Sequence, residues 1–296
     1  MLKRVIFLAL FLSVTDCLFS QVQVADPVQI QDQQGDGSIF VSFVRDIPGD
    51  VVKTKNESVV ALRSSISAVN DIGSVYSQHF YGCGTVVWDG YVLSVLHIFG
   101  QHHPALWRGT DQYPTKATIF GGSDFFFAKV VFIDLTADLI LLKIETPNER
   151  GAVFNKKPVK IANTTYILDP TSGEPLVLYD KFWAFGFYTD YPGFFHTAIL
   201  GPYRAITNSL EQNRLLPNLM GVVQGPTQAG FSGTPLLSYN GTMMGLVDAT
   251  STLNTWVVTV ETINSFLKDA AAHLGLDVDG KPAVPVPPSP LSPEEK

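Results

Sequence analysis

The sequence predicts an all-β protein with one C-terminal helix, on the strength of three observations. Short apolar runs of strand length recur between residues 84 and 260, many of them separated by Gly or Pro. No helical pattern alternates with these runs, as βαβ units would require. A single strong helical stripe follows the last run. Hydrophobic residues make up 46% of the 296, which is ample material for a sizeable core.

The strands are placed by the turn signals between them. Residues 84–88 and 91–95 flank Asp89-Gly90, a pair that suits the positive φ angles of a tight hairpin turn. Further strands are predicted at 117–120, 125–133, 139–144, 182–187, 196–200, 220–224, 235–238, 243–247 and 255–260.

The helix is predicted over residues 262–274. Its apolar stripe follows helical spacing and consists of Ile263, Phe266, Leu267, Ala270, Ala271 and Leu274. Thr262 is expected to be the N-cap and Gly275 the C-terminal stop. We expect this helix to dock its stripe on the core.

Residues 1–20 are predicted to be a cleavable secretory signal. Lys3 and Arg4 precede an apolar run at 5–12, and this order is typical of such signals. The apolar run is too short to span a membrane. A lipid anchor at Cys17 is the alternative, although the small residue expected just before such a cysteine is absent. The signal predicts a secreted or periplasmic protein with no transmembrane anchor after cleavage.

Two other terminal segments are expected to lie outside the folded domain. Residues 21–75 form a polar, weakly patterned N-terminal extension. Residues 276–296 form a proline-rich tail, since six of the 19 prolines fall between 281 and the end of the chain. Proline removes backbone donors and favours extended, solvated chain.

Charge and cysteine content exclude several classes. The net charge of -7 argues against a nucleic-acid binder, which needs clustered cations for the phosphate backbone. Two cysteines exclude a disulfide-dense scaffold, and Cys83 loses its only possible intramolecular partner if Cys17 leaves with the signal. No cofactor or metal is expected, because His97, His102 and His103 have no carboxylate or cysteine at ligand spacing and are better interpreted as loop histidines.

Three short segments carry the chemistry. His97 ends an apolar strand, Asp138 begins a strongly apolar one, and Ser232 lies in a glycine-flanked turn before a third. A serine hydroxyl needs an adjacent base to act as a nucleophile, and histidine has the pKa for that role. A buried carboxylate then fixes the imidazole tautomer. Gly230 and Gly233 allow a sharp turn in which the amides of Gly230 and Ser232 converge on an oxyanion.

Taken together, these segments resemble the trypsin-like serine proteases, and most closely the exported HtrA (Deg) type. The matching stretches are Gly82-Cys83-Gly84, Asp89 to Ser94 with His97, Asp138 to Ile144, Gly230 to Leu237 and Asn240 to Val247. The resemblance covers about residues 76–268. It implies a catalytic triad of His97, Asp138 and Ser232 and a chymotrypsin-like double barrel of two six-stranded antiparallel β-barrels.

The resemblance also sets the expected domain limits. The protease domain would span 76–275, with barrels at about 76–170 and 171–260. An α/β-hydrolase is excluded because Thr234 breaks its G-x-S-x-G motif and because its Asp and His would have to follow the serine.

The chain departs from the family pattern at several positions. Phe231 replaces the usual Asn or Asp before the serine, which removes zymogen activation through a freed N-terminus, and Thr234 replaces a glycine. Asp248 occupies a position beside the catalytic carboxylate, so it either turns into the substrate cleft or perturbs Asp138. No PDZ domain follows, so regulation by such modules is not expected.

The resemblance places the substrate-specificity pocket between two short segments. Its residues would be Pro226, Thr227, Gln228, Asp248, Ala249 and Thr250. Small or medium uncharged side chains are expected before the scissile bond, because a buried unpaired charge is costly. A basic residue is the alternative if Asp248 points into the cleft.

The sequence therefore predicts an exported serine endopeptidase that acts on protein or peptide substrates through an acyl-enzyme. The alternatives are a catalytically impaired protease-fold protein that binds peptides and a β-rich surface protein with a chance motif. The oligomeric state is not predicted.

Overall fold

The computed structural model describes residues 47–69, 75–99, 116–121, 124–168, 175–177, 181–187, 195–208, 219–251 and 253–283. All of them fall in one compact unit that begins at Ile47. The predicted signal (1–20), the first part of the extension, His102 and His103, and the last 13 residues of the proline-rich tail lie outside the described residues.

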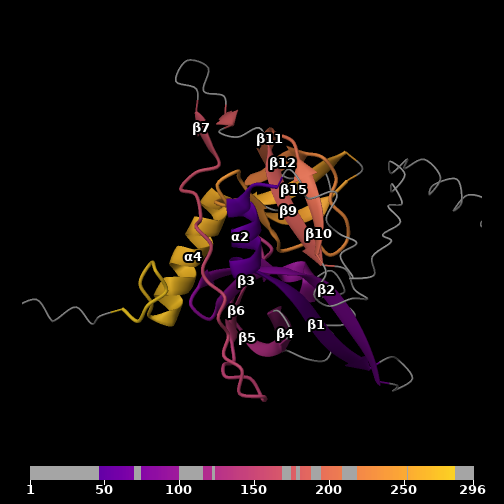
Figure 1. Cartoon of the computed structure of the whole chain (residues 1–296), viewed down its shortest axis with the longest axis vertical. Coiled ribbons are helices and arrows are strands. Elements are labelled where there is room, and N and C mark those ends of the chain that lie inside the picture. The colour runs from indigo at the N-terminus through magenta and orange to yellow at the C-terminus, as the bar shows by residue number, and fades with distance from the viewer. Residues whose placement is uncertain are drawn as a thin grey trace, which may run out of the picture. The chain divides into compact units, whose positions relative to one another are not determined.

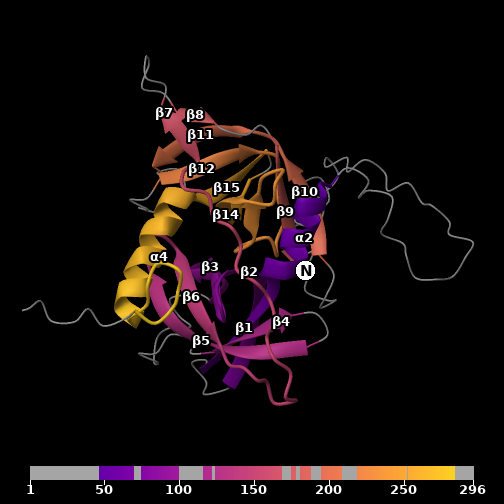
Figure 2. The ribbon, with the colours of Figure 1, turned by 60° about the vertical axis from the view of Figure 1, so that its left-hand side comes forward.

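The first sheet is a closed barrel of antiparallel strands in the order β1-β2-β3-β6-β5-β4. Its strands are β1 (Val59–Val69), β2 (Val75–Trp88), β3 (Tyr91–Val95), β4 (Lys116–Gly121), β5 (Asp124–Asp134) and β6 (Leu139–Ile144). Gly90 has φ 73° in the β2–β3 turn, as the Asp-Gly signal predicts. Figures 1 and 2 show this barrel on one side of the molecule and the second sheet on the other.

The second sheet has seven antiparallel strands in the order β10-β9-β13-β14-β15-β12-β11. Its strands are β9 (Phe182–Phe187), β10 (Phe195–Leu200), β11 (Tyr203–Asn208), β12 (Leu219–Gln224), β13 (Pro235–Leu237), β14 (Met243–Thr250) and β15 (Asn254–Thr259). A separate pair, β7 (Tyr166–Leu168) and β8 (Pro175–Val177), connects the two sheets along the chain. The predicted all-β class with two curled sheets is confirmed, although the second sheet has seven strands where six were expected.

The barrel begins earlier than the predicted limit at residue 76. Strand β1 pairs with β2 along its whole length and with β4 on its other edge, so it closes the barrel. Before it, α2 (Gly49–Ser58) buries Val51. The sequence did not predict these elements because the second half of β1 is rich in serine and α2 has few apolar residues. Pairing on both edges, rather than local pattern, makes β1 a strand.

The C-terminal helix α4 (Val260–Leu274) contacts both sheets. Its predicted stripe faces inward, and the ring of Phe266 lies 5.2 Å from that of Phe132 on β5. Gly275 ends the helix with φ 67°, as predicted. The N-cap is Thr259 rather than Thr262, because β15 runs directly into the helix.

Residues 276–283, expected in the solvated tail, fold back as a turn. Leu276 forms a β-bridge with Pro282, and the indole Nε1 of Trp88 donates to the carbonyl of Val278 at 3.2 Å. The described chain therefore extends past the predicted domain end at residue 275. A cavity of about 680 Å³ beneath this turn is lined by residues such as Val159 and Leu267, and no triad residue lines it.

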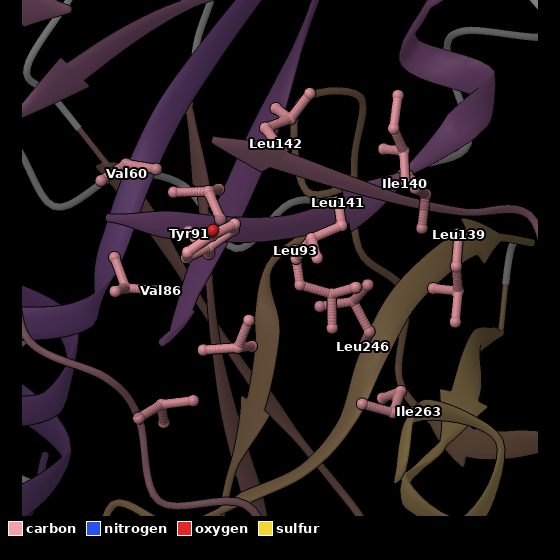
Figure 3. Close-up of a cluster of buried hydrophobic side chains, with 14 of the residues drawn as sticks. Val60, Val86, Tyr91, Leu93, Leu139, Ile140, Leu141, Leu142, Leu246 and Ile263 are labelled. Atoms are coloured by element: carbon pink, nitrogen blue, oxygen red, sulfur yellow. The ribbon is translucent and has the colours of Figure 1, made fainter. Parts of the chain in front are cut away.

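A single cluster of buried side chains joins the barrel, the second sheet and α4 (Figure 3). Leu93 and Leu139 from the barrel are fully buried near Leu246 of β14 and Ile263 of α4. This shared core packs the two sheets against each other, so side chains from both sheets come together at their junction. In the part of the chain that the structure describes, no helix is long and apolar enough to cross a membrane.

Candidate active site

Strand pairing in the barrel brings His97 and Asp138 together. β3 and β6 are antiparallel neighbours, and Val95 at the end of β3 pairs with Leu139 at the start of β6. His97 lies just beyond that end in the 3-10 turn η1 (Leu96–Phe99), and Asp138 lies just before β6. The amide of Leu96 donates to the carbonyl of Asp138 at 2.8 Å, which fixes the spacing of the two backbones.

The backbone of Asp138 is held in an unusual conformation. Its φ of 55° is the only positive value of a non-glycine residue in the described chain. Aspartate tolerates this left-handed region better than most residues, but the position is still sparsely populated. The conformation turns the chain from the preceding loop into β6 and leaves the side chain buried.

Ser232 comes from the second sheet, in the turn between β12 and β13. The amide of Cys83 on β2 donates to the carbonyl of Ser232 at 2.7 Å, and the amide of Phe187 on β9 donates to that of Gly230 at 2.9 Å. Gly233 must be glycine here, because it has φ 82° and a Cβ would lie 2.1 Å from the carbonyl oxygen of Cys83. The serine turn is therefore attached to both sheets.

The three predicted residues form one chain of hydrogen bonds. His97 Nδ1 lies 2.6 Å from Asp138 Oδ2, and His97 Nε2 lies 3.0 Å from Ser232 Oγ. Asp138 is buried, whereas the His97 side chain is 18% exposed. The serine hydroxyl has a second acceptor, the carbonyl of Asp248, at 3.2 Å. This is the arrangement that a base-activated serine nucleophile requires.

The turn also presents two amides beside the serine. Gly230 has φ 92°, and a Cβ there would lie 2.0 Å from the carbonyl oxygen of Phe187. Among the described residues, no acceptor is hydrogen-bonded to the amide of Gly230 or of Ser232. The amides of Gly230 and Ser232 stay the predicted donors to an oxyanion.

The side chain of Asp248 points toward His97. It is 3% exposed, and its Oδ1 lies 3.3 Å from His97 Nδ1. Of the two orientations that the sequence left open, the structure has the one in which Asp248 lies beside the triad, whereas the pocket residues and the substrate preference stay predictions. The physical reason is a β-bulge: Val247 pairs with Val257 and Ala249 with Trp256, so Asp248 is the extra residue of β14.

The two carboxylates and the imidazole perturb one another. Burial, together with the neighbouring Asp248, raises the pKa of Asp138 and outweighs the opposing effect of His97. Burial alone would lower the pKa of His97, but hydrogen bonds and charge attraction from Asp138 and Asp248 raise it to about 9. Asp248 contributes to both shifts, because its negative charge raises the pKa of Asp138 and that of His97.

The two segments expected to form the specificity pocket lie side by side. The amide of Thr227 donates to Thr250 Oγ1 at 3.1 Å, and that hydroxyl lies 3.0 Å from the carbonyl of Thr227. Thr255 Oγ1, within 3.3 Å of Thr227 Oγ1, adds a third hydroxyl. Thr227 is buried, while Pro226, Gln228 and Thr250 are exposed and Ala249 is half-buried. Apart from the buried Asp248, the described segments 226–228 and 248–250 carry no charged side chain.

The same cluster contains a donor set that a metal could use. His97, Asp138 and Asp248 each offer one ligand atom, and these atoms lie within 4.8 Å of one another. The 2.6 Å contact between His97 and Asp138 is a direct hydrogen bond, however, so an ion would have to displace that proton. The geometry fits a proton network better than a metal centre.

Ser94 and Cys83 are supporting residues that sequence reasoning did not identify. Ser94 is fully buried and donates to the carbonyl of Cys83 at 2.7 Å. The thiol of Cys83 lies within hydrogen-bond distance of the carbonyls of Phe185 and Gly230, and it is in no disulfide. The signal for Ser94 was a lone polar residue inside the apolar strand that leads to His97.

Comparison with known proteins supports the fold. No protein-family model matches the chain, and no curated protein sequence is similar to it. The crystal structure of Rv3671c protease from M. tuberculosis in its active form is similar, with a TM-score of 0.50, 18% identity, and coverage of 77% of this chain and 85% of that one. The inactive form of the same protease gives a TM-score of 0.50 and 18% identity over 75% of this chain and 93% of that one. Two curled antiparallel sheets, a C-terminal helix and this similarity give the chain the fold of a chymotrypsin-like double barrel.

Proposed function

We propose that this protein is a serine endopeptidase in which Ser232 is the nucleophile, His97 the general base and Asp138 the residue that orients His97. The observation that carries the proposal is the continuous hydrogen-bond chain from Asp138 Oδ2 through both nitrogens of His97 to Ser232 Oγ, at 2.6 and 3.0 Å. The similarity to a protease structure supports it at the level of the fold.

The geometry accounts for each step of acyl transfer. Nε2 of His97 takes the Ser232 proton as Oγ attacks the substrate carbonyl carbon, and Asp138 stabilises the imidazolium that forms. The amides of Gly230 and Ser232 stabilise the negative charge on the carbonyl oxygen. The imidazolium then gives its proton to the departing amine, which leaves an ester on Ser232. Water, deprotonated by the same nitrogen, hydrolyses that ester and restores the hydroxyl.

A serine-directed fluorophosphonate probe tests the proposal directly. We expect the full chain to be labelled once, at Ser232, and Ser232→Ala to abolish labelling and lower peptidase turnover by about six orders of magnitude. Asp138→Asn should lower peptidase turnover by about 10⁴-fold, because it favours the wrong tautomer of His97. Labelling should be followed from about pH 6 to 10, since the pKa of His97 is raised to about 9.

Ser265→Ala is the matched control, because it makes the same chemical change on the exposed face of α4. It should leave labelling and turnover unchanged. Full activity of Ser232→Ala would show that another residue is the nucleophile.

For substrate preference, we infer that the residue before the scissile bond is small or medium-sized and uncharged. The paired segments at 226–228 and 248–250 offer threonine hydroxyls, and the one carboxylate there is turned toward His97. A buried charged side chain would find no partner. Fluorogenic peptides that differ only at this residue test the inference, and fastest cleavage after a basic or an acidic residue would contradict it.

Export through the segment 1–20 and kinship with the HtrA (Deg) type belong to the proposal as well. They rest on the charged-then-apolar order of the first residues and on the quoted motifs. A reporter fused to residues 1–20 should be exported and shortened, whereas replacement of apolar residues in 5–12 by charged ones should keep it inside the cell.

A second candidate, a catalytically impaired protein that binds peptides in the same cleft, is favoured by one observation. Asp248 brings a second buried carboxylate to His97, and a base held protonated cannot accept the serine proton. Absence of probe labelling throughout the pH range, together with saturable peptide binding, would select this candidate.

A further inference from the structure

Asp248 is a buried carboxylate that the usual three-residue chain does not require. It is 3% exposed and lies 3.3 Å from the same nitrogen, His97 Nδ1, that contacts Asp138 at 2.6 Å. The bulge in β14 removes Asp248 from the regular pairing with β15. Bulges commonly re-aim a side chain beside an active site. The backbone is thus shaped to present this carboxylate to the ring.

Among the described residues, two carboxylates act on the charge of His97. The groups that act on its charge are Asp138, from the turn before β6, and Asp248, from β14. The serine turn contributes the neutral hydroxyl of Ser232. Strands β1 and β2 also pack on η1, and their described titratable side chains are Arg63, His79, Tyr81 and Cys83.

Two buried carboxylates around one imidazole favour the charged ring. Both carboxylates face the same ring nitrogen, Nδ1, at 2.6 and 3.3 Å. Nδ1 carries a single hydrogen, so Asp248 acts on the ring mainly through its negative charge, which attracts an imidazolium more than a neutral imidazole. This is why the pKa of His97 is raised to about 9 even though burial opposes it.

We propose that Asp248 is a positioning residue that holds His97 protonated at neutral pH, so that the Ser232–His97 pair becomes competent only in alkaline solution. The inference rests on the proposed function for its catalytic consequence, whereas its electrostatic part concerns His97 alone. In the neutral range most molecules would carry an imidazolium that cannot accept the serine proton. Activity would then rise about tenfold per pH unit until the ring loses its proton.

Nitrogen NMR of the full chain with ¹⁵N-labelled histidine rings tests the electrostatic part. The chain has six histidines, and a His97→Gln variant assigns the signals of His97. We expect the His97 titration midpoint of the parent protein near pH 9, and Asp248→Asn to lower it by at least about one unit. In Asp248→Asn the acid limb of the pH profile of kcat/KM should move to lower pH by the same amount. At pH 7 the variant should therefore have a kcat/KM about tenfold higher or more.

Asp269→Asn is the control, since it removes one carboxylate from the exposed face of α4 and should leave the midpoint in place. A parent midpoint close to 6.5, or equal midpoints for the parent and Asp248→Asn, would overturn the inference. If Asp248→Asn fails to fold, Asp248→Ser replaces it, and the parent midpoint decides the matter without any variant.

The two proposals fail in distinguishable ways. Probe labelling of Ser232 with an unperturbed His97 midpoint would refute the role of Asp248 and leave the peptidase in place. A raised midpoint that Asp248→Asn lowers, with no labelling at any pH, would refute the peptidase and retain the effect of Asp248 on the ring.

Discussion

The contact between Gly186 and Phe231 provides a quantitative test of how the serine turn is held. Phe231 directly precedes Ser232, is 4% exposed, and lies against the backbone of β9. A Cβ at Gly186 would stand 2.1 Å from Cδ2 and 2.2 Å from Cε2 of the Phe231 ring. Since ordinary contacts of a Cβ begin at 3.4 Å, Gly186→Ala must displace the ring by more than about 1 Å.

The expected cost follows from the packing. Overpacking of this kind lowers the free energy of unfolding by about 1–3 kcal/mol. Phe231→Ala should lower it by about 3–5 kcal/mol, because it leaves a cavity where the buried ring was. The double variant should cost less than the sum of the two, because the new methyl group occupies part of the space that the ring leaves. Displacing the ring also moves Ser232, so Gly186→Ala should slow labelling by the fluorophosphonate probe.

Urea unfolding measures these costs, provided that the m-value stays constant across the variants. Gly49→Ala is the matched control, because a Cβ at that position has no atom within 4 Å. A Gly186→Ala variant within about 0.5 kcal/mol of the parent, or strict additivity in the double variant, would refute the reasoning.

Three other measurements follow from buried polar groups. Burial would raise the pKa of the half-buried Glu261 carboxylate, but bonds from the hydroxyl of Thr164 at 2.7 Å and the amide of Thr165 at 2.8 Å lower it. Glu261→Gln should therefore cost about 1–3 kcal/mol at neutral pH, and the difference in urea unfolding should shrink as the pH falls below 4.5. Burial raises the pKa of the Cys83 thiol to about 12, so in a Cys17→Ser background a thiol reagent should modify it only on unfolding, and rapid labelling of the native protein would contradict its burial. Because the pKa of His97 is raised from 6.5 to about 9, its stabilisation is full below pH 6.5 and is lost as pH rises through 9, and Asp248→Asn should reduce this fall in urea unfolding.

The strands that the sequence predicted best are those buried on all sides. Predicted and observed limits agree at β3 (Tyr91–Val95), β6 (Leu139–Ile144) and β9 (Phe182–Phe187). Every residue of β3 and β9 is buried, so these strands appear as unbroken apolar runs bounded by turns. In such segments local composition and tertiary environment require the same structure.

Strands whose environment is set by distant partners were not predicted. The second half of β1 and much of β11 mix polar with apolar residues, and each is a strand because a neighbouring strand supplies its hydrogen bonds. Helix α2 has one buried apolar residue and therefore no stripe from which to predict it. These elements depend on contacts between residues far apart in the chain, which periodicity does not record.

At the site, residue types could be predicted and orientations could not. The order of motifs identified His97, Asp138 and Ser232, and the structure brings their side chains within hydrogen-bond distance. For Asp248 the sequence left two orientations open. The choice between them depends on which residue of β14 loses its partner on β15, and a register shift of one residue leaves no trace in composition.

The candidate site depends on the junction of the two sheets rather than on either sheet alone. The barrel contributes His97 and Asp138, and the second sheet contributes Ser232 and Asp248. The 3.0 Å contact between His97 and Ser232 is therefore only as well defined as the packing between the sheets. The backbone of Cys83 sets that packing, because its amide is bonded to Ser232 and its carbonyl accepts from Ser94, three residues before His97. One peptide segment on β2 thus holds both the turn that carries Ser232 and the strand that leads to His97.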